Sequence, residues 1–213
     1  MGVFDQVPLL LPDSIFQLNT NYQADTRKSK VDLGVGVYKN ENLLAEILPS
    51  VEKAEKHLLK SEKTKTYLPI EGDPFFLKTV GKLVFGSDFF STHQERLAAV
   101  QAIGGTGALR LAGTFLKQEV SSKVYVSNPT WPNHQGIFMN CGLQVYSYPY
   151  YDKSNHYIEF EKLIQFLSRI EDKSIFVLHA CCHNPTGMDL TVVQCKTLLK
   201  VCEDRKIIPL SDC

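Results

Sequence analysis

Short apolar runs alternate with helix-spaced apolar residues through the C-terminal half of the chain. Runs at 97–103, 124–126, 143–148, 174–180 and 206–210 have the length and apolar character of buried strands. Between them, apolar side chains recur three and four positions apart, as they do on an amphipathic helix. Strands and helices in steady alternation predict an α/β sandwich with a mainly parallel sheet.

The helices predicted between these strands each have their own signature. Apolar residues fall at positions 108, 111, 112 and 115 in the first helix, and at 160, 163, 164 and 167 in the third. The second helix is expected to end at Asn140, because Gly142 follows as a stop signal. Thr191 and Gln194 form a capping-box pattern for the last helix, whose apolar face is 195, 198, 199 and 202.

The N-terminal part of the chain is patterned less regularly. Residues 1–30 are expected to form an extended arm with a short helix over 14–23, and the alternation over 31–38 predicts a short strand. Two further helices are predicted, one opened by Pro49 and one running from Asp73 to Phe85, where Gly86 follows.

Composition and charge indicate which classes of protein and of partner this chain fits. The 213 residues are 44% hydrophobic and 22% charged with a net charge of zero, which is typical of a soluble globular protein and points to no nucleic acid and no membrane as partner. The six cysteines form no C-x-x-C pair, and no Cys/His cluster has zinc spacing, so no metal site is predicted. We interpret them as buried or incidental thiols of a cytoplasmic protein.

The motif Gly-Gly-Thr-Gly-Ala at 104–108 lies between a predicted strand and a predicted helix. Backbone N–H groups exposed by glycine, a threonine hydroxyl and the positive end of a helix dipole together would hold an anion such as a phosphate. The alternative is a plain strand-to-helix turn. Arg110 occupies the place of the third glycine of a dinucleotide fingerprint, and no Gly-Lys-Ser/Thr follows, so neither a Rossmann nor a Walker A motif is present.

Polar and aromatic side chains follow the predicted strands, and each has a structural and a functional interpretation. Trp131 is either a core anchor or a flat platform for an aromatic ligand, and His134, one helical turn on, would face the same space. Asn184 either caps its Asn-Pro-Thr-Gly turn or offers a donor and an acceptor to a ligand. Asp212 is either a strand-end carboxylate or the partner of a cationic ring nitrogen.

Five stretches in fixed order carry a family resemblance. They are Leu-Gly-Val-Gly-Val-Tyr at 33–38, Tyr-Leu-Pro-Ile at 67–70, Gly-Gly-Thr-Gly-Ala-Leu at 104–109, Pro-Thr-Trp-Pro-Asn-His at 129–134, and 176–187. With these, the chain resembles the aspartate/aromatic branch of the class I, fold-type I aminotransferases. The resemblance implies a PLP-transferase-like three-layer sandwich, with 1–45 as N-terminal arm and part of a small domain and 46–213 as the first part of a large PLP-binding domain.

The resemblance also implies roles for individual residues around pyridoxal 5'-phosphate (PLP). Gly105 and Thr106 would hold the cofactor phosphate, with Gly104 where many members carry a serine. Trp131 would stack on the pyridine ring and Asn184 would bond its phenolic oxygen, and both would contact substrate.

Further positions follow from the same resemblance. Asp212 would pair with the protonated ring nitrogen, supported from behind by His179 and His134. Tyr67 would reach the phosphate of the neighbouring subunit's cofactor in a homodimer, and Gly36 would lie near the substrate carboxylate. Thr106, Trp131, Asn184 and Asp212 are therefore expected around one hollow, and the Asn–Pro bonds at 128–129 and 184–185 are expected to be cis.

The activity implied is amino-group transfer between an amino acid and a 2-oxo acid, with L-aspartate and 2-oxoglutarate as the favoured pair. The lysine that forms the Schiff base follows the position of Asp212 in the family, so residues 1–213 contain no catalytic residue. We therefore expect a truncated fold that does not transaminate alone and leaves apolar helix faces exposed. The alternatives are a non-catalytic remnant or PLP-binding module, a nicotinamide-type dehydrogenase, and a PLP lyase or decarboxylase of the same fold.

Overall fold

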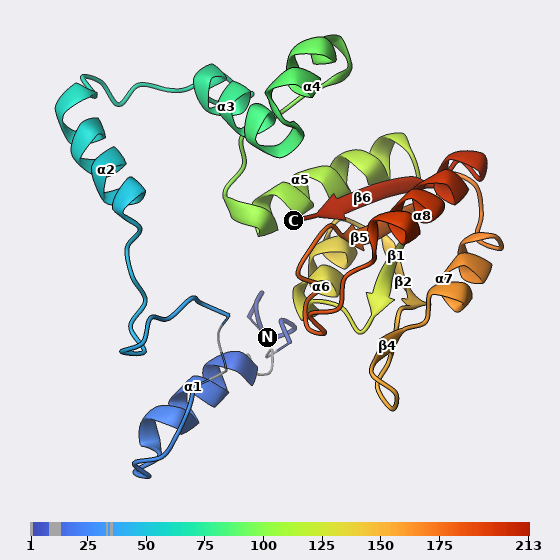
Figure 1. Ribbon diagram of the computed structural model, residues 1–213, viewed down its shortest axis with the longest axis horizontal. Coiled ribbons are helices and arrows are strands. Elements are labelled where there is room, and N and C mark those ends of the chain that lie inside the picture. Colours follow the sequence, from blue (N-terminus) through green and yellow to red (C-terminus); the bar gives the residue numbers. More distant parts are fainter. Residues whose placement is uncertain (1, 9–13, 33, 35) are drawn as a thin grey trace. The chain divides into compact units, whose positions relative to one another are not determined.

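Figure 1 shows the computed structural model, which describes residues 2–8, 14–32, 34 and 36–213. Contacts divide the chain into two units, Met1–Thr66 and Tyr67–Cys213. The division falls after Thr66, so helix α2 belongs with the first unit, whereas the sequence predicted a boundary at 45/46. The assignment of these parts to the small and large domains of the family stays a prediction.

The N-terminal unit contains helices α1 (Ser14–Ala24) and α2 (Pro49–Ser61), which confirms both predicted helices. Pro49 sits at the start of α2, where its missing N–H costs nothing because the first helical N–H groups have no acceptor in the helix. The predicted strand at 31–38 includes Leu33 and Val35, which lie outside the described residues. The described residues of that stretch form no strand.

The second unit is built on four parallel strands in the order β2-β1-β5-β6. The strands are β1 (Lys123–Asn128), β2 (Gln144–Pro149), β5 (Ile175–His179) and β6 (Ile208–Asp212). The helices between them are α5 (Gly104–Glu119), α6 (Pro132–Asn140), α7 (Phe160–Leu167) and α8 (Val192–Asp204). The predicted parallel α/β sheet is confirmed.

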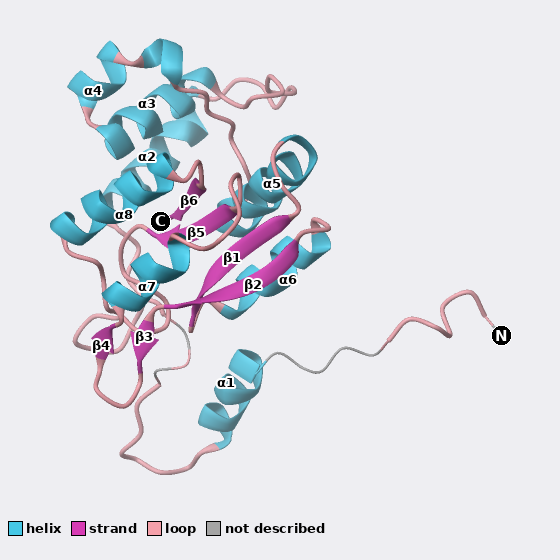
Figure 2. Ribbon diagram, turned by 90° about the vertical axis from the view of Figure 1, so that its right-hand side faces the viewer, coloured by secondary structure: helices cyan, strands magenta, loops and turns pink. Residues whose placement is uncertain are grey.

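Two apolar cores lie on opposite faces of this sheet. Along β5, Phe176 and Leu178 belong to the core with α7 and α8, while Ile175 and Val177 belong to the core with α5 and α6. This alternation follows from the two-residue period of a strand, which sends successive side chains to opposite faces. Helices therefore cover both faces, and the three layers are visible in Figure 2.

Helix α5 packs through a different face from the predicted one. Leu109, Gly113 and Leu116 are buried, whereas Leu111 and Phe115 of the predicted apolar face are exposed. The reason is Gly113, because a Cβ there would come within 2.9 Å of the Cys141 sulfur at the end of α6. A glycine lets the two helices approach closely, and its face becomes the buried one.

The predicted strand at 97–103 is wrong. In the described part of the chain, no strand pairs with this extended segment, whose Gln101 N–H bonds the Glu71 carbonyl at 2.7 Å. An isolated extended segment gains no ladder of hydrogen bonds. Several short elements were also not predicted: α4 (Ser87–Thr92), η1 (Gln94–Arg96), and the hairpin of β3 (Tyr151–Asp152) and β4 (Tyr157–Ile158).

Side-chain caps fix the starts of two helices. The Asp73 carboxylate accepts the Phe76 N–H at 2.7 Å and opens α3 (Pro74–Phe85), which ends at Gly86 as predicted. Thr191 and Gln194 form the reciprocal capping box expected for α8. No helix in the described ranges is long and apolar enough to cross a bilayer.

Adjacent leucines of α8 offer a matched test of the packing. Leu198 is fully buried against the sheet, while Leu199 is 45% exposed. We expect Leu198→Ala to lower the free energy of unfolding by about 2–5 kcal/mol and Leu199→Ala by less than about 1 kcal/mol, because only the first leaves a cavity. Urea denaturation measures both, and equal losses would contradict this placement of the core.

Candidate functional site

The carboxyl ends of three neighbouring strands meet at one edge of the sheet. His179 ends β5, Asp212 ends β6, and the two are register partners. Thr130 follows the end of β1, and His134 lies in the first turn of α6. Parallel strands all deliver their last residues to the same edge, so four polar groups from distant parts of the sequence are brought together.

These groups form one continuous chain of hydrogen bonds. The Asn184 N–H meets His179 Nδ1 at 3.2 Å, and His179 Nε2 lies 3.2 Å from Thr130 Oγ1. Thr130 Oγ1 lies 2.8 Å from His134 Nδ1, and His134 Nε2 lies 2.9 Å from Asp212 Oδ2.

The groups at the two ends of this hydrogen-bond chain determine which atom donates in each of its bonds. A backbone N–H only donates, so His179 Nδ1 accepts and its Nε2–H donates to Thr130. The Thr130 hydroxyl then donates to His134 Nδ1, and His134 Nε2–H donates to Asp212. An ionised carboxylate only accepts, so the chain ends there with every group satisfied.

Burial favours the neutral form of His179, because it lowers the pKa of that imidazole. His134 is completely buried. Among the described residues, Asp212 Oδ1 has no hydrogen-bond partner, and the Asp212 side chain is 25% exposed. One carboxylate oxygen is therefore anchored and the other is open to a ligand.

Trp131 and Asn184 flank this chain. Trp131 precedes α6 and meets His134 edge-on, with ring centroids 5.4 Å apart and planes at 84°. Asn184 gives its backbone N–H to His179, and its residue is exposed. The Asn128–Pro129 and Asn184–Pro185 bonds are both cis, as expected from the family resemblance.

His183 is a buried residue that the sequence analysis missed. Its Nε2 lies 2.9 Å from Ser127 Oγ, its Nδ1 lies 2.9 Å from Thr186 Oγ1, and its ring stacks on Tyr150 at 4.1 Å. These contacts tie the loop that carries Asn184 to strand β1. The only signal in the sequence is a polar side chain between a buried strand and its Asn-Pro-Thr-Gly turn.

The loop around His183 combines an imidazole with a lowered pKa and a nearby carboxylate. Burial lowers the pKa of His183 to about 4, so the imidazole is neutral at pH 7. Asp189 accepts the backbone N–H groups of Cys182 and His183, each at 2.8 Å, and these bonds lower its pKa. The loop is thus held by one neutral ring and one carboxylate.

The glycine motif forms the start of α5. Gly104 has a φ of +63°, which favours glycine, and no atom lies within 4 Å of a Cβ built on Gly105. The first intrahelical bond of α5 is made by the Gly107 N–H, so the N–H groups of Gly105 and Thr106 remain available. The site matches an anion cradle at a helix N-terminus.

The predicted site residues are joined only in part. Thr106 lines a hollow of about 400 Å³ with Arg110 and Asn133, but Trp131, Asn184 and Asp212 do not line it. The lining continues to Pro132, the neighbour of Trp131, so the two parts of the site abut at the start of α6.

Two predicted residues stand apart from this group. Tyr67 is fully exposed. Gly36 belongs to the N-terminal unit and is exposed, and no atom lies within 4 Å of a Cβ built on it. Their predicted roles remain predictions.

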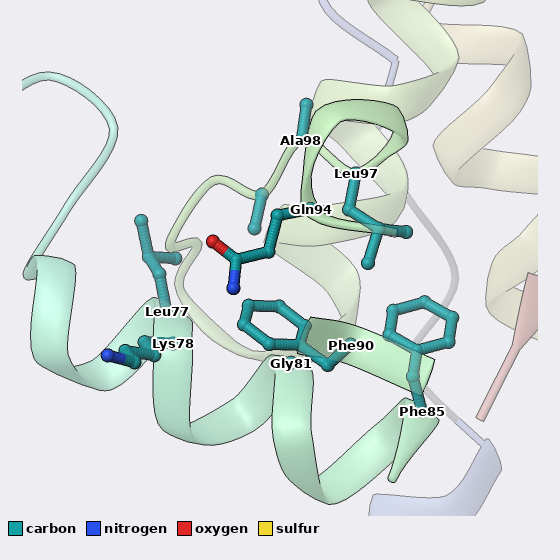
Figure 3. Close-up of a pocket in the computed structure, with 9 residues that line it drawn as sticks. Leu77, Lys78, Gly81, Phe85, Phe90, Gln94, Leu97 and Ala98 are labelled. Atoms are coloured by element: carbon teal, nitrogen blue, oxygen red, sulfur yellow. The ribbon is translucent and has the colours of Figure 1, made fainter. Parts of the chain in front are cut away.

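Figure 3 shows an apolar hollow of about 350 Å³ between α3 and the segment after it. Leu77 and Phe85 line it from α3, and Phe90 and Leu97 from the segment that follows. None of the predicted site residues lines it. The polar chemistry and this apolar hollow are therefore separate features.

The fold is that of a PLP-type aminotransferase, and comparison with known proteins gives the family. The chain belongs to the aminotransferase class I and II family, whose family model matches residues 28–213. It is therefore not a nicotinamide-type dehydrogenase domain.

Individual relatives agree with this assignment. The chain is 42% identical to an aspartate aminotransferase of Escherichia coli K12 over 99% of its length and 53% of that protein. It is similar to the structure of an aromatic-amino-acid aminotransferase from Burkholderia pseudomallei covalently bound to pyridoxal phosphate, with a TM-score of 0.94, 40% identity, and coverage of 100% and 53% of the two chains. A cytoplasmic aspartate aminotransferase of Saccharomyces cerevisiae has a TM-score of 0.90 at 36% identity, with coverage of 99% and 52%. The chain spans about half the length of the curated relatives it matches.

The hydroxyl of Thr130 is the central link of the hydrogen-bond chain. Thr130→Val leaves one nitrogen on each of two histidines without a partner, so we expect it to lower the free energy of unfolding by about 1–3 kcal/mol. Thr130→Ser keeps the hydroxyl and serves as the matched control. If valine and serine proved equally stable in urea denaturation, the chain as described would be wrong.

The lowered pKa of His183 predicts a pH dependence of stability. The unfolded imidazole titrates near 6.5 and the folded one near 4, so between these values the unfolded state binds more protons. The free energy of unfolding should therefore fall as pH drops from about 6.5 to about 4, by up to about 3 kcal/mol at about 1.4 kcal/mol per pKa unit.

The variant His183→Gln isolates this contribution. It cannot take up the proton, so its stability should depend less steeply on pH over the same interval. The lowered pKa of His179 acts in the same direction, and its ring centroid lies 4.2 Å from that of His183, so the difference between the two slopes includes the interaction of the two rings. Urea midpoints measured from pH 4.5 to pH 7 provide the test, and identical slopes would contradict a neutral, buried His183.

Proposed function

We propose that this chain supplies the cofactor-binding part of a PLP-dependent aminotransferase that moves an amino group between L-aspartate and 2-oxoglutarate. The observation that carries the proposal is the Asp212 carboxylate, with one oxygen anchored by His134 and the other open. A carboxylate so held is the group that a protonated pyridine nitrogen requires.

Each part of PLP has a suitable group among the described residues. The N–H groups at the start of α5 and the Thr106 hydroxyl suit the phosphate. The indole of Trp131 suits the flat ring, and the side-chain amide of Asn184 suits the phenolic oxygen. When bound, PLP supplies an electron sink for the bonds at the substrate α-carbon.

The residues of the chain perform the supporting steps. Asp212 would hold the proton on the ring nitrogen of bound PLP, because an ionised carboxylate raises the proton affinity of a group beside it. His134 holds that carboxylate in place and, through Thr130 and His179, is itself held by the backbone of Asn184. Rotation of the Asp212 side chain would break its hydrogen bond to His134 Nε2, so this bond fixes the orientation of the carboxylate.

The remaining elements of the proposal concern the whole protein. We propose that it acts as a homodimer in which Tyr67 reaches the partner's cofactor phosphate, and that Gly36 lies near the substrate carboxylate. The Schiff-base lysine is proposed to follow Asp212 in the sequence. A cytoplasmic location is supported by the similarity to the cytoplasmic yeast enzyme.

A second candidate function is PLP binding without catalysis. It is favoured because, among the described residues, no lysine forms an ion pair with the Asp212 carboxylate. The two candidates differ in the turnover of the whole protein: formation of glutamate from aspartate and 2-oxoglutarate supports the first, and PLP binding without glutamate formation supports the second.

The single tryptophan reports cofactor binding directly. We expect PLP to quench the fluorescence of Trp131 in a saturable titration. Asp212→Asn keeps the shape but loses the charge, so it should weaken binding about tenfold or more, which corresponds to a hydrogen bond to a charged group of about 1.5–3 kcal/mol.

A matched control is Asp204→Asn, which removes an exposed carboxylate at the end of α8. It should leave the PLP affinity unchanged. Absence of saturable quenching, or equal affinity in wild type and Asp212→Asn, would overturn the assignment of the cofactor site.

A further inference from the structure

The buried imidazole of His183 takes no part in the steps proposed around Asp212. The residue is only 1% exposed, and each of its ring nitrogens bonds a hydroxyl group. The partner of Nε2 is Ser127 in strand β1, 56 positions away in the sequence, and the partner of Nδ1 is Thr186 in the same loop. A buried ring with both nitrogens paired keeps one orientation, because rotation would leave a buried polar group without a partner.

Two aromatic rings and a carboxylate complete the surroundings of His183. The Tyr150 ring stacks on the imidazole with centroids 4.1 Å apart, and the His179 ring lies against it at 4.2 Å. The Asp189 carboxylate accepts the backbone N–H of His183 at 2.8 Å. All of these groups belong to the unit Tyr67–Cys213, so the ring and its backbone are held within that unit alone.

Asn184 follows His183 directly, and its backbone is held on both sides. Its N–H bonds His179 Nδ1 at 3.2 Å, and the Gly187 N–H bonds the His183 carbonyl at 2.7 Å, which closes the turn that contains Asn184. Among the described residues, the side-chain amide of Asn184 has no hydrogen-bond partner. The direction of that amide is therefore set by the backbone that carries it.

We propose that His183 is a positioning residue, which directs the Asn184 amide toward the phenolic oxygen of the cofactor through its bond to Ser127. The inference rests on the proposed function, in which that oxygen is the partner of Asn184. A group that binds a cofactor atom has to be held within about 0.5 Å of its productive position, and buried neighbours with their own hydrogen bonds supply this precision.

Strand β1 explains why the bond to Ser127 matters for the site. The strand ends at Asn128, and Thr130 and Trp131 follow within three residues. The His183–Ser127 bond therefore ties the loop of Asn184 to the segment that carries the proposed platform for the cofactor ring. It fixes the separation between the group at the face of that ring and the group at its edge.

Two small ligands separate this role from general support of the loop. Pyridoxamine 5'-phosphate has the phenolic oxygen and forms no Schiff base, and its 3-deoxy analogue lacks only that oxygen. The ratio of the two affinities reports the contacts of this oxygen, because all other contacts are common to both ligands. We expect the purified protein, freed of bound cofactor, to bind the first ligand about tenfold or more tightly than the second in isothermal titration calorimetry.

The variant His183→Leu removes both hydroxyl bonds of the ring. We expect it to lower the affinity ratio about threefold or more. It should lower the ratio no further in a protein that already carries Asn184→Ala, because the effect passes through that amide. His183→Gln, whose amide can reach Ser127, should keep most of the ratio. His57→Gln, which changes an exposed histidine of helix α2, is the matched control and should leave both affinities unchanged.

Several results would overturn this role of His183. Equal binding of the two ligands by the wild-type protein would do so whether or not any variant folds. An unchanged ratio in His183→Leu, with both affinities lowered equally, would contradict it as well. If His183→Leu does not fold, Ser127→Ala removes only the hydroxyl and should lower the ratio in the same direction, and an unchanged ratio there would be decisive against the inference.

The proposed cofactor site fails by a different result. That site is wrong if the wild-type protein binds neither ligand, or if Asp212→Asn binds both as tightly as the wild type. Binding that depends on Asp212, together with a ratio that does not depend on His183, would overturn the positioning role alone.

Discussion

The parallel alignment of β1, β5 and β6 is the constraint on which the site depends. Because these strands run the same way, their last residues reach one edge of the sheet, and Thr130, His179 and Asp212 come within one hydrogen-bond chain. The backbone N–H of Asn184 starts this chain and the Asp212 carboxylate ends it. The direction of each bond between them is then fixed, because neither end can reverse its role.

The packing of the sheet protects this arrangement. Residues from α7 and α8 fill one face and residues from α5 and α6 fill the other, so the central strand β5 is buried on both sides. His134 lies in α6, on the same helix as the core residue Phe138, and the two rings stack at 5.9 Å. The apolar core and the hydrogen-bond chain therefore both depend on α6, so a shift of this helix would change both.

The sheet could be predicted from the sequence because buried strands and amphipathic helices have distinct periods, and these periods decide the fold class locally. The packed face of α5 could not be predicted, because glycine does not stand out in a hydrophobic pattern. Gly113 matters because its missing side chain lets Cys141 approach closely. The segment 97–103 looks like a strand, but a strand exists only beside a partner. The contacts of His183 depend on tertiary proximity, which no short-range pattern contains.

The direction of the hydrogen-bond chain is tested most directly by ¹⁵N nuclear magnetic resonance of the histidine rings at neutral pH. The account predicts that His134 and His179 are both neutral and that both carry their proton on Nε2. The Nε2 proton of His134 should show a correlation with the Asp212 side chain. A proton on Nδ1 of either ring, or a doubly protonated ring at neutral pH, would contradict it.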